Sequence, residues 1–442
     1  MQTSTIKFSQ IEDRIDAEYY KPEYLKIYNN LEKRKGVVLL EDVAKEVVSG
    51  SYIDTYFPKR TLYLRVNNLK EDGFDLSDVK YVDIQYSKVP QKIRVHTNDL
   101  VLGRTGTVGT TLIVPNELDG AVMSQHITKI VPSEKINRFY LMIYLNSRHG
   151  RLQAEKTALG SMQKELTLDA TKNIKVFIPP QSLQQKIEKI VKEAQEKRKL
   201  ADEKYDEAEE ILNKELGLGN LDLSTQKTFE AKFSEAEDRF DPEYYQPVYK
   251  NVYKFLKQKS KPLTEVCKIV RTKISPQNTP EKLFNYIEIG GIDNSTGEIA
   301  EILNLRGWQV PSGVKYVVRN NDVLLSAVRT YLKGIALVSN NYEGGIATTG
   351  FHVLREPIIK PETLFLFLRS RLGLIQFEKF FLGSTYPVIK GFDLKNILVP
   401  ILSQSLQQKI SSLIQESFKL RREAKELIDR AKKEVEEMVI GK

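Results

Sequence analysis

Two stretches of this chain are near copies of each other. Residues 8–24 read FSQIEDRIDAEYYKPEY and residues 233–249 read FSEAEDRFDPEYYQPVY, identical at 11 of 17 positions at an offset of 225. Farther along, residues 181–187 and 404–410 both read QSLQQKI, at an offset of 223. Because the two offsets nearly agree, the sequence between these anchors has kept its length while diverging. Solenoid repeats have periods of about 20–50 residues, so we interpret this longer period as a duplicated domain.

The composition is that of a soluble globular protein. Of 442 residues, 41% are hydrophobic and 28% are charged, and a chain of this length is expected to form two or more domains. No apolar run approaches the roughly 18 residues of a membrane span, and the N-terminus does not resemble a secretory signal. The single cysteine, Cys267, excludes an internal disulfide, and with four scattered histidines a structural metal site is not expected. We therefore expect a cytoplasmic protein without membrane contact.

The charge balance favours a polyanionic partner. The formal net charge is +9, and Lys and Arg can replace the counterions condensed on phosphates. Many basic proteins bind no nucleic acid, so the charge becomes informative only together with another feature.

Each copy is predicted to contain a short helix, a mostly β body and a long helix. Apolar residues at helical spacing predict the short helix up to Lys35 in the first copy and Lys259 in the second. The bodies, residues 37–180 and 262–402, contain short β-branched runs broken by turn-forming residues. Within the bodies, the apolar spacing predicts helical inserts over residues 137–152 and 362–377.

The long helices carry a heptad pattern. In the second copy the two heptad lines are Leu406, Leu413, Leu420 and Leu427, and Ile410, Ala424, Ala431 and Met438. In the first copy they are Leu183 and Ile190, and Ile187, Ala194, Ala201 and Ala208. A repeat of this kind predicts a coiled coil, and each helix would be about 50 Å long at about 1.5 Å per residue. Antiparallel pairing would place one body at either end of a dumbbell, with a span of at most about 15 base pairs of duplex DNA.

The predicted fold is α+β, with two similar, mostly β domains separated by an antiparallel coiled coil and related by an approximate two-fold repeat. The expected domains are residues 1–180 and 220–402. The expected spacer helices are residues 181–219 and 403–442.

These features together resemble the specificity subunit of type I restriction-modification systems. The resemblance covers nearly the whole chain and rests on the order of its motifs, repeated twice. The motifs are the two DR-x-D-x-EYY openings, DLVLGRTGTVG at 99–109, GSMQKELT at 160–167, and the helix entries IPPQSLQQKI and VPILSQSLQQKI. The second body departs from the pattern, because residues 326–334 read SAVRTYLKG where the first body has its glycine-rich turn.

The resemblance implies a non-catalytic subunit in which each body is a target-recognition domain for half of a split double-stranded DNA sequence. The long helices would act as a spacer and as a docking surface for two methyltransferase subunits, which in turn engage restriction subunits. S-adenosylmethionine, ATP and Mg would belong to those partners, with no cofactor in this chain.

Candidate DNA-binding residues lie in polar or glycine-rich loops, where Arg, Lys, Asn, Gln, Ser and Thr can contact base edges or phosphates. In the first copy they are Arg65, Asn67, Asn68, Lys70, Arg104, Thr105, Thr107, Ser161, Gln163 and Lys164. In the second copy they are Arg329, Thr330, Lys333, Ser384 and Tyr386, the first three as approximate counterparts of the Arg104 turn. An ordinary tight turn or polar loop accounts for each of these residues as well, and the two Glu-Tyr-Tyr segments could equally pack on their own bodies.

The common catalytic signatures are absent from the sequence. Pro179-Pro180 is preceded by Ile178 rather than Asp or Asn, which argues against an amino-methyltransferase. No HExxH, GxSxG or Walker A motif occurs, although a loosely spaced carboxylate-lysine nuclease site stays open. The alternative from another class is a coiled-coil adaptor whose bodies bind protein.

Overall fold

The computed structural model describes residues 6, 11, 14–71, 73–76, 78–160, 164–218, 221–231, 239–383 and 385–441. The chain divides into two compact units, one formed by residues 1–198 with 421–442 and the other by residues 199–420. Each unit therefore contains part of both long helices. No helix of the described residues is long and apolar enough to cross a bilayer.

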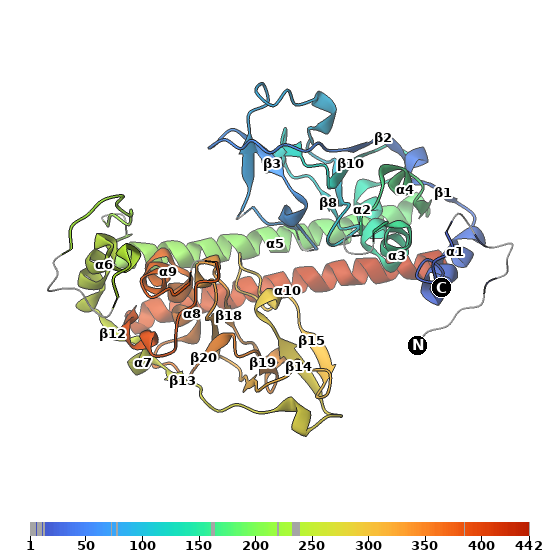
Figure 1. Ribbon diagram of the computed structural model, residues 1–442. Coiled ribbons are helices and arrows are strands. Elements are labelled where there is room, and N and C mark those ends of the chain that lie inside the picture. The colour runs from blue at the N-terminus through green and yellow to red at the C-terminus, as the bar shows by residue number, and fades with distance from the viewer. Residues whose placement is uncertain are drawn as a thin grey trace. The chain divides into compact units, whose positions relative to one another are not determined.

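The first unit is built around a four-stranded antiparallel sheet of order β2-β10-β7-β8 (Figure 1). Its strands are β2 Ala44–Ser49, β7 Leu100–Gly103, β8 Thr111–Ile113 and β10 Ile127–Pro132. A second sheet, β6-β3-β9, contains β3 Thr61–Leu64, β6 Lys80–Val82 and β9 Val122–Met123. Two small antiparallel pairs are β1 Val37–Leu39 with β11 Lys175–Phe177, and β4 Leu69–Lys70 with β5 Gly73–Phe74. The short helices are α1 Pro22–Glu32, α2 Arg138–Asn146, α3 Arg148–Thr157 and α4 Leu168–Lys172.

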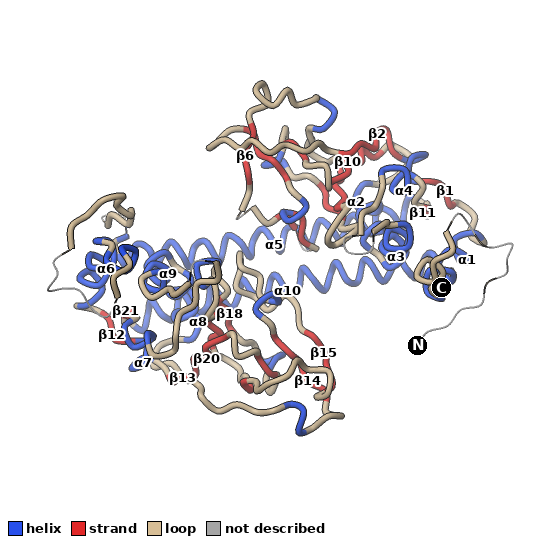
Figure 2. The backbone as a smooth tube through the Cα atoms, viewed as in Figure 1, coloured by secondary structure: helices blue, strands red, loops and turns tan. Residues whose placement is uncertain are grey.

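The second unit repeats this architecture (Figure 2). Its central sheet has the order β13-β20-β17-β18, from β13 Lys268–Ile269, β17 Val323–Ser326, β18 Ile335–Leu337 and β20 Phe351–Arg355. The second sheet, β15-β14-β19-β16, contains β14 Leu283–Ile287, β15 Leu303–Arg306, β16 Tyr316–Val317 and β19 Ile346–Ala347. β12 Ser260–Pro262 pairs with β21 Leu398–Pro400. The short helices are α6 Pro247–Lys257, α7 Leu263–Val266, α8 Pro361–Arg369 and α9 Arg371–Glu378.

The predicted α+β class and the internal repeat are confirmed. In each unit the third and fourth strands of the central sheet form a hairpin, and the second sheet contains one parallel strand pair, β3 with β9 or β14 with β19. The buried apolar side chains of helices and sheets form the cores, as their alternating and helical spacings lead us to expect.

The predicted helical inserts are each two helices rather than one. α2 and α3 are separated by Ser147, and α8 and α9 by Ser370. A glycine follows each break at the same distance, and a Cβ on Gly150 or Gly373 would lie only 2.4 Å from Leu145 O or 2.3 Å from Phe367 O. Because only glycine allows this close approach, the chain can turn sharply between the two helices.

The long helices are α5 Gln181–Leu216 and α10 Gln404–Ile440, and they pack antiparallel (Figure 1). Ion pairs link Lys186 to Glu434 at 2.8 Å and Lys197 to Glu423 at 2.7 Å, so moving 11 residues forward along α5 moves 11 residues back along α10. The Ser417 hydroxyl donates a hydrogen bond to the carbonyl of Ala201 at 2.7 Å in the same antiparallel sense.

One heptad line of each helix is buried along most of its length. On α10 it consists of Ile410, Ser417, Ala424 and Ala431, and on α5 of Ile187, Ala194, Ala201 and Ala208. Of the second line of α10 that the sequence suggested, Leu413 is buried, whereas Leu406, Leu420 and Leu427 are only partly buried. Small residues at the contact line let the two backbones approach closely, which explains why alanine rather than leucine occupies it.

Candidate nucleic-acid interface

The Arg104 side chain holds the turn between β7 and β8 against neighbouring segments of the first unit. Its side chain is 13% exposed, and it donates to the carbonyls of Leu166 at 2.8 Å and Gln125 at 2.9 Å. Its Nη1 also makes a short contact to the Ser49 hydroxyl, and its Nη2 forms an ion pair with Glu165 at 3.0 Å. Binding of DNA by this guanidinium would therefore have to replace contacts that shape the turn.

Thr105 and Thr107 lie on opposite sides of the same turn. Thr105 is buried and pairs through its backbone with Glu165, and its hydroxyl has no hydrogen-bond partner within the described residues. Thr107 is exposed, and its carbonyl accepts a hydrogen bond from the Thr110 hydroxyl at 3.0 Å. Of the two threonines, Thr107 presents its side chain to solvent.

The four candidates after β3 separate into structural and exposed residues. Asn68 is buried, and its amide accepts from the Arg65 N–H at 2.9 Å and donates to the Asp75 carbonyl at 2.8 Å, which fixes the turn. Arg65 forms an ion pair with Asp78 at 2.9 Å, and the hydrogen bond from Arg65 lowers the pKa of the Asp78 carboxyl. Asn67 and Lys70 are exposed.

The predicted polar loop near residue 161 is described only in part. Ser161 and Gln163, and Ser384 in the second copy, lie outside the described residues. Lys164 forms an ion pair with Glu18 at 2.7 Å, and this contact lowers the pKa of the Glu18 carboxyl. Lys164 therefore ties the loop to the opening segment of its own unit.

The two Glu-Tyr-Tyr openings pack on their own units in the same way. Tyr20 donates its hydroxyl to the Arg14 carbonyl at 2.7 Å, and Tyr245 donates to the Arg239 carbonyl at 2.6 Å. The adjacent ring pairs meet edge to face, with centroids 5.0 Å apart in both copies. The repeated residues thus form a repeated structural motif.

In the second unit, the structure changes the correspondence between the two turns. Thr105 and Val328 hold equivalent positions, because Thr105 forms an isolated bridge with Glu165 and Val328 forms one with Val388. The counterpart of Arg104 is therefore Ala327 and not Arg329. Arg329 corresponds instead to Gly106, a residue of the turn itself.

Arg329 and Tyr386, separated by 57 positions in sequence, lie together on the surface of the second unit. The Arg329 guanidinium lies 4.3 Å from the Tyr386 ring centroid and donates two hydrogen bonds to the Thr385 carbonyl, at 3.1 and 3.3 Å. Thr330 is buried and donates to the Ser326 carbonyl at 2.7 Å, so it is a structural residue. Lys333 is partly exposed at the end of the turn.

Sequence reasoning missed Tyr331, which is 42% exposed and lies between the two cations of this turn. The available signal was the segment SAVRTYLKG, where basic and aromatic side chains replace the glycine-rich pattern of the first copy.

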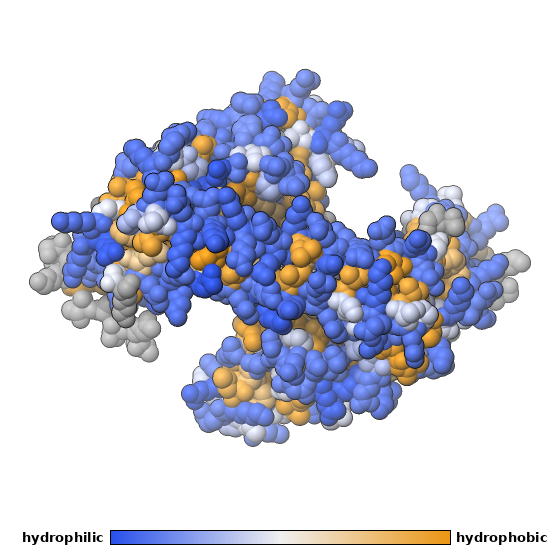
Figure 3. All heavy atoms as spheres, turned by 180° about the vertical axis from the view of Figure 1, so that it is seen from behind, coloured by the Kyte–Doolittle hydropathy of each residue, from blue (hydrophilic) through white to orange (hydrophobic). Residues whose placement is uncertain are grey.

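The face of the molecule in Figure 3 is mostly hydrophilic, with small apolar groups scattered among polar side chains.

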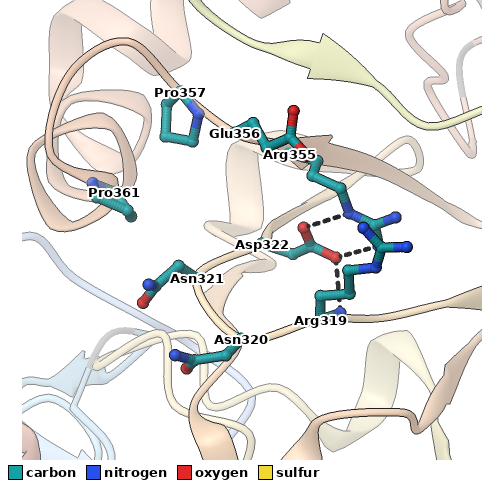
Figure 4. Close-up of a pocket in the computed structure, with 8 residues that line it drawn as sticks. All are labelled: Arg319, Asn320, Asn321, Asp322, Arg355, Glu356, Pro357 and Pro361. Atoms are coloured by element: carbon teal, nitrogen blue, oxygen red, sulfur yellow. Dashed lines mark hydrogen bonds and ion pairs between the residues drawn. The ribbon is translucent and has the colours of Figure 1, made fainter.

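A pocket of 280 Å³ in the second unit is lined mainly by polar residues (Figure 4). Two of its charged groups are paired with each other: Arg355 donates to both carboxylate oxygens of Asp322 at 2.9 and 2.7 Å. Asp322 also accepts from the Arg319 backbone N–H at 2.8 Å, and in the first unit Asp99 accepts from the His96 N–H at the same distance. We therefore interpret the pocket as the outer side of a repeated structural turn.

Comparison with known proteins finds similarity to a DNA specificity domain. Residues 5–210 match the family model of the type I restriction modification DNA specificity domain. Among solved structures, the chain is similar to the S subunit of a type I restriction-modification system from M. genitalium, with 14% identity and a TM-score of 0.40 over 90% of this chain and 95% of that one. It is also similar to the HsdS subunit from Thermoanaerobacter tengcongensis, with 16% identity and a TM-score of 0.30 over 92% and 97% of the two chains. The residues matched by the family model cover the first copy of the repeat and most of α5, so the similarity to a DNA specificity domain applies to that part of the chain.

Proposed function

We propose that each unit recognises one half of a bipartite DNA target. The observation that carries this proposal is that the two units share one framework of sheets but differ in the side chains on equivalent turns. Gly106 of the first unit corresponds to Arg329 of the second, and the charges around these two turns differ. A shared framework with different loop side chains suits two surfaces that bind the same kind of ligand, duplex DNA, at different base sequences.

We further propose that α5 and α10 set the spacing between the half-sites and that the repeated elements dock two methyltransferase subunits. The repeated openings support this because each places a strongly exposed apolar residue beside the Arg-Asp ion pair: Ile15 is 88% exposed and Phe240 is 80% exposed. Two equal surfaces favour two copies of one partner. Restriction subunits, S-adenosylmethionine, ATP and Mg would join through those partners, and this chain would perform no catalysis.

Mapping of methylated adenines tests the proposal directly. DNA from cells that express the chain with its methyltransferase partner should carry methylation at one bipartite sequence, with two constant half-sites and a constant spacer. Purified complex should bind a duplex with this sequence far more tightly than a scrambled duplex at moderate salt. Equal affinity for both duplexes would contradict the proposal and favour the protein-binding adaptor.

A paired deletion tests the spacing role of the helices. Removal of residues 195–201 from α5 together with 417–423 from α10 takes one heptad from each helix and keeps the remaining alanine contacts in register. Seven residues correspond to about 10 Å of helix, or about three base pairs of duplex. The mapped spacer should shorten while both half-sites stay the same. A change in the half-site bases, or an unchanged spacer, would show that the helices do not set the spacing.

A further inference from the structure

The turn between β17 and β18 holds two basic residues in left-handed backbone conformation. Arg329 has φ 48° and Lys333 has φ 61°, on either side of the short 3₁₀ helix Thr330–Leu332. An L-residue with positive φ brings its Cβ too close to the backbone, so this conformation is uncommon outside glycine, asparagine and aspartate. Such strain persists only where surrounding contacts impose it, and it concentrates at functional sites.

The first unit shows how the same turn is made without strain. Gly106, the counterpart of Arg329, has φ 68°, and Gly109, which precedes β8 as Lys333 precedes β18, has φ 85°. Glycine adopts this conformation at no steric cost. The second unit therefore keeps a backbone shape suited to glycine but places two long cationic side chains on it.

Buried contacts hold the second turn in this shape. Arg369, which is 1% exposed, donates to the Lys333 carbonyl at 2.7 Å and to the Ile335 carbonyl at 3.2 Å. The hydroxyl of buried Thr330 donates to the Ser326 carbonyl across the turn. The strained residues are thus fixed from the inside, while their side chains lie at the surface.

The surface around the turn combines cations with exposed aromatic rings. Tyr386 is 63% exposed beneath the Arg329 guanidinium, and Tyr331 is 42% exposed. The Thr385 carbonyl and the Tyr386 ring orient the guanidinium before any ligand binds, so less conformational entropy is lost when it binds one. Basic side chains interleaved with aromatic ones are characteristic of nucleic-acid surfaces.

We propose that Arg329 and Lys333 contact backbone phosphates of the half-site bound by the second unit. This inference rests on the proposed function and adds to it a surface that the first unit lacks at the equivalent turn. Phosphates suit both cations: lysine binds them as a point charge and arginine through paired N–H donors. The first unit must position its half-site through other residues, because Gly106 and Gly109 carry no side chains there.

The test measures how the affinity for a duplex that carries the mapped bipartite target depends on salt concentration, and compares this dependence between variants. The protein is the full chain in complex with its methyltransferase. The variants are R329G and K333G, which remove each charge and allow the backbone to relax. Each lost phosphate contact should lower the slope of log K against log salt concentration by about 1. Asn321→Gly is the matched control, because Asn321 also has positive φ (67°) in the second unit but carries no charge.

The expected result is a lower slope for R329G and K333G and an unchanged slope for N321G, with Tm no lower than wild type for K333G and N321G. R329Q and K333Q keep the native backbone and should lower the slope equally, so they decide the matter if a glycine variant folds poorly. Unchanged salt slopes in the glutamine variants would overturn the inference. Weaker binding of the methyltransferase by these variants, with an unchanged salt slope for DNA binding, would overturn it as well. If the wild-type complex binds the target and the scrambled duplex equally well, the proposed function is wrong. A lower salt slope of the variants on the scrambled duplex would still support a phosphate contact at this turn.

Discussion

Replacement of Arg369 by methionine should severely destabilise the second unit. The guanidinium is buried at the end of α8 and donates to four carbonyls and one hydroxyl. Its acceptors are Tyr205 Oη at 2.9 Å and the carbonyl oxygens of Lys333, Ile335, Asn294 and Ser295, at 2.7, 3.2, 2.9 and 2.8 Å. Methionine fills much of the volume and removes every donor.

The expected loss is about 3–5 kcal/mol. Each acceptor left without a donor in a buried site costs about 1–3 kcal/mol, and relaxation or entry of water recovers part of that cost. Because a domain is stabilised by only about 5–15 kcal/mol in total, a loss of this size removes much of the stability of the unit. It also releases the Lys333 backbone from its inner anchor.

Urea unfolding followed by tryptophan fluorescence measures this loss. The only tryptophan, Trp308, lies in the second unit and reports on that unit specifically. The matched control is Arg371→Met, two residues along the chain, where the side chain is 46% exposed and pairs with Glu378 at 2.6 Å. Solvent screens that pair, so its loss should cost less than about 1 kcal/mol. Equal losses for R369M and R371M would refute the assignment of Arg369 as the buried anchor.

Three further changes follow from single contacts. Asn137→Ala removes the side chain that accepts hydrogen bonds from the N–H groups of Phe139 and Tyr140 at the start of α2. Chemical denaturation should show that the free energy of unfolding falls by about 1–2 kcal/mol. An unchanged free energy would mean that the cap is replaceable. Ala201→Leu overpacks the α5–α10 contact, so thermal unfolding should show a loss of stability of at least about 1–3 kcal/mol. The control Leu200→Ala changes a neighbouring side chain that is 40% exposed and should be nearly neutral. Similar losses for the two variants would contradict the assigned contact line. Burial raises the pKa of the Asp99 carboxyl above its ordinary value of 3.8. The protonated carboxyl therefore stabilises the folded protein relative to the charged one. This contribution is complete below pH 3.8 and is lost as the pH rises through the folded-state pKa. Asp99→Asn should therefore be more stable than wild type at pH 7, with the difference shrinking towards pH 3 in urea titrations; a constant difference would exclude this carboxyl as the cause.

The architecture could be predicted well from the sequence because local signals repeated twice. The heptad spacing of Ile187, Ala194, Ala201 and Ala208 predicts the long helix wherever it packs, and β-branched runs bounded by glycine predict the strands. The break inside each helical insert was missed because the apolar spacing runs through Ser147 and Ser370 without interruption. Only the close approach at Gly150 and Gly373 reveals it.

The candidate site could be predicted only in part, since exposure and hydrogen bonding are not encoded by residue type. Arg104 and Asn68 have the chemistry of DNA-binding residues, yet their polar atoms are used to fix turns within the first unit. Thr107, Asn67 and Lys70 keep exposed side chains. The DNA-binding role of all these residues stays a prediction.

By itself, the sequence determined the duplication and the class of each element, because these depend on spacing along the chain. The tertiary structure alone decided which heptad line is buried, which residue is the counterpart of Arg104 and which cations lie on strained backbone. These properties depend on which segments meet in space, and a shift of two positions between equivalent turns changes whether a guanidinium lies inside the fold or on its surface.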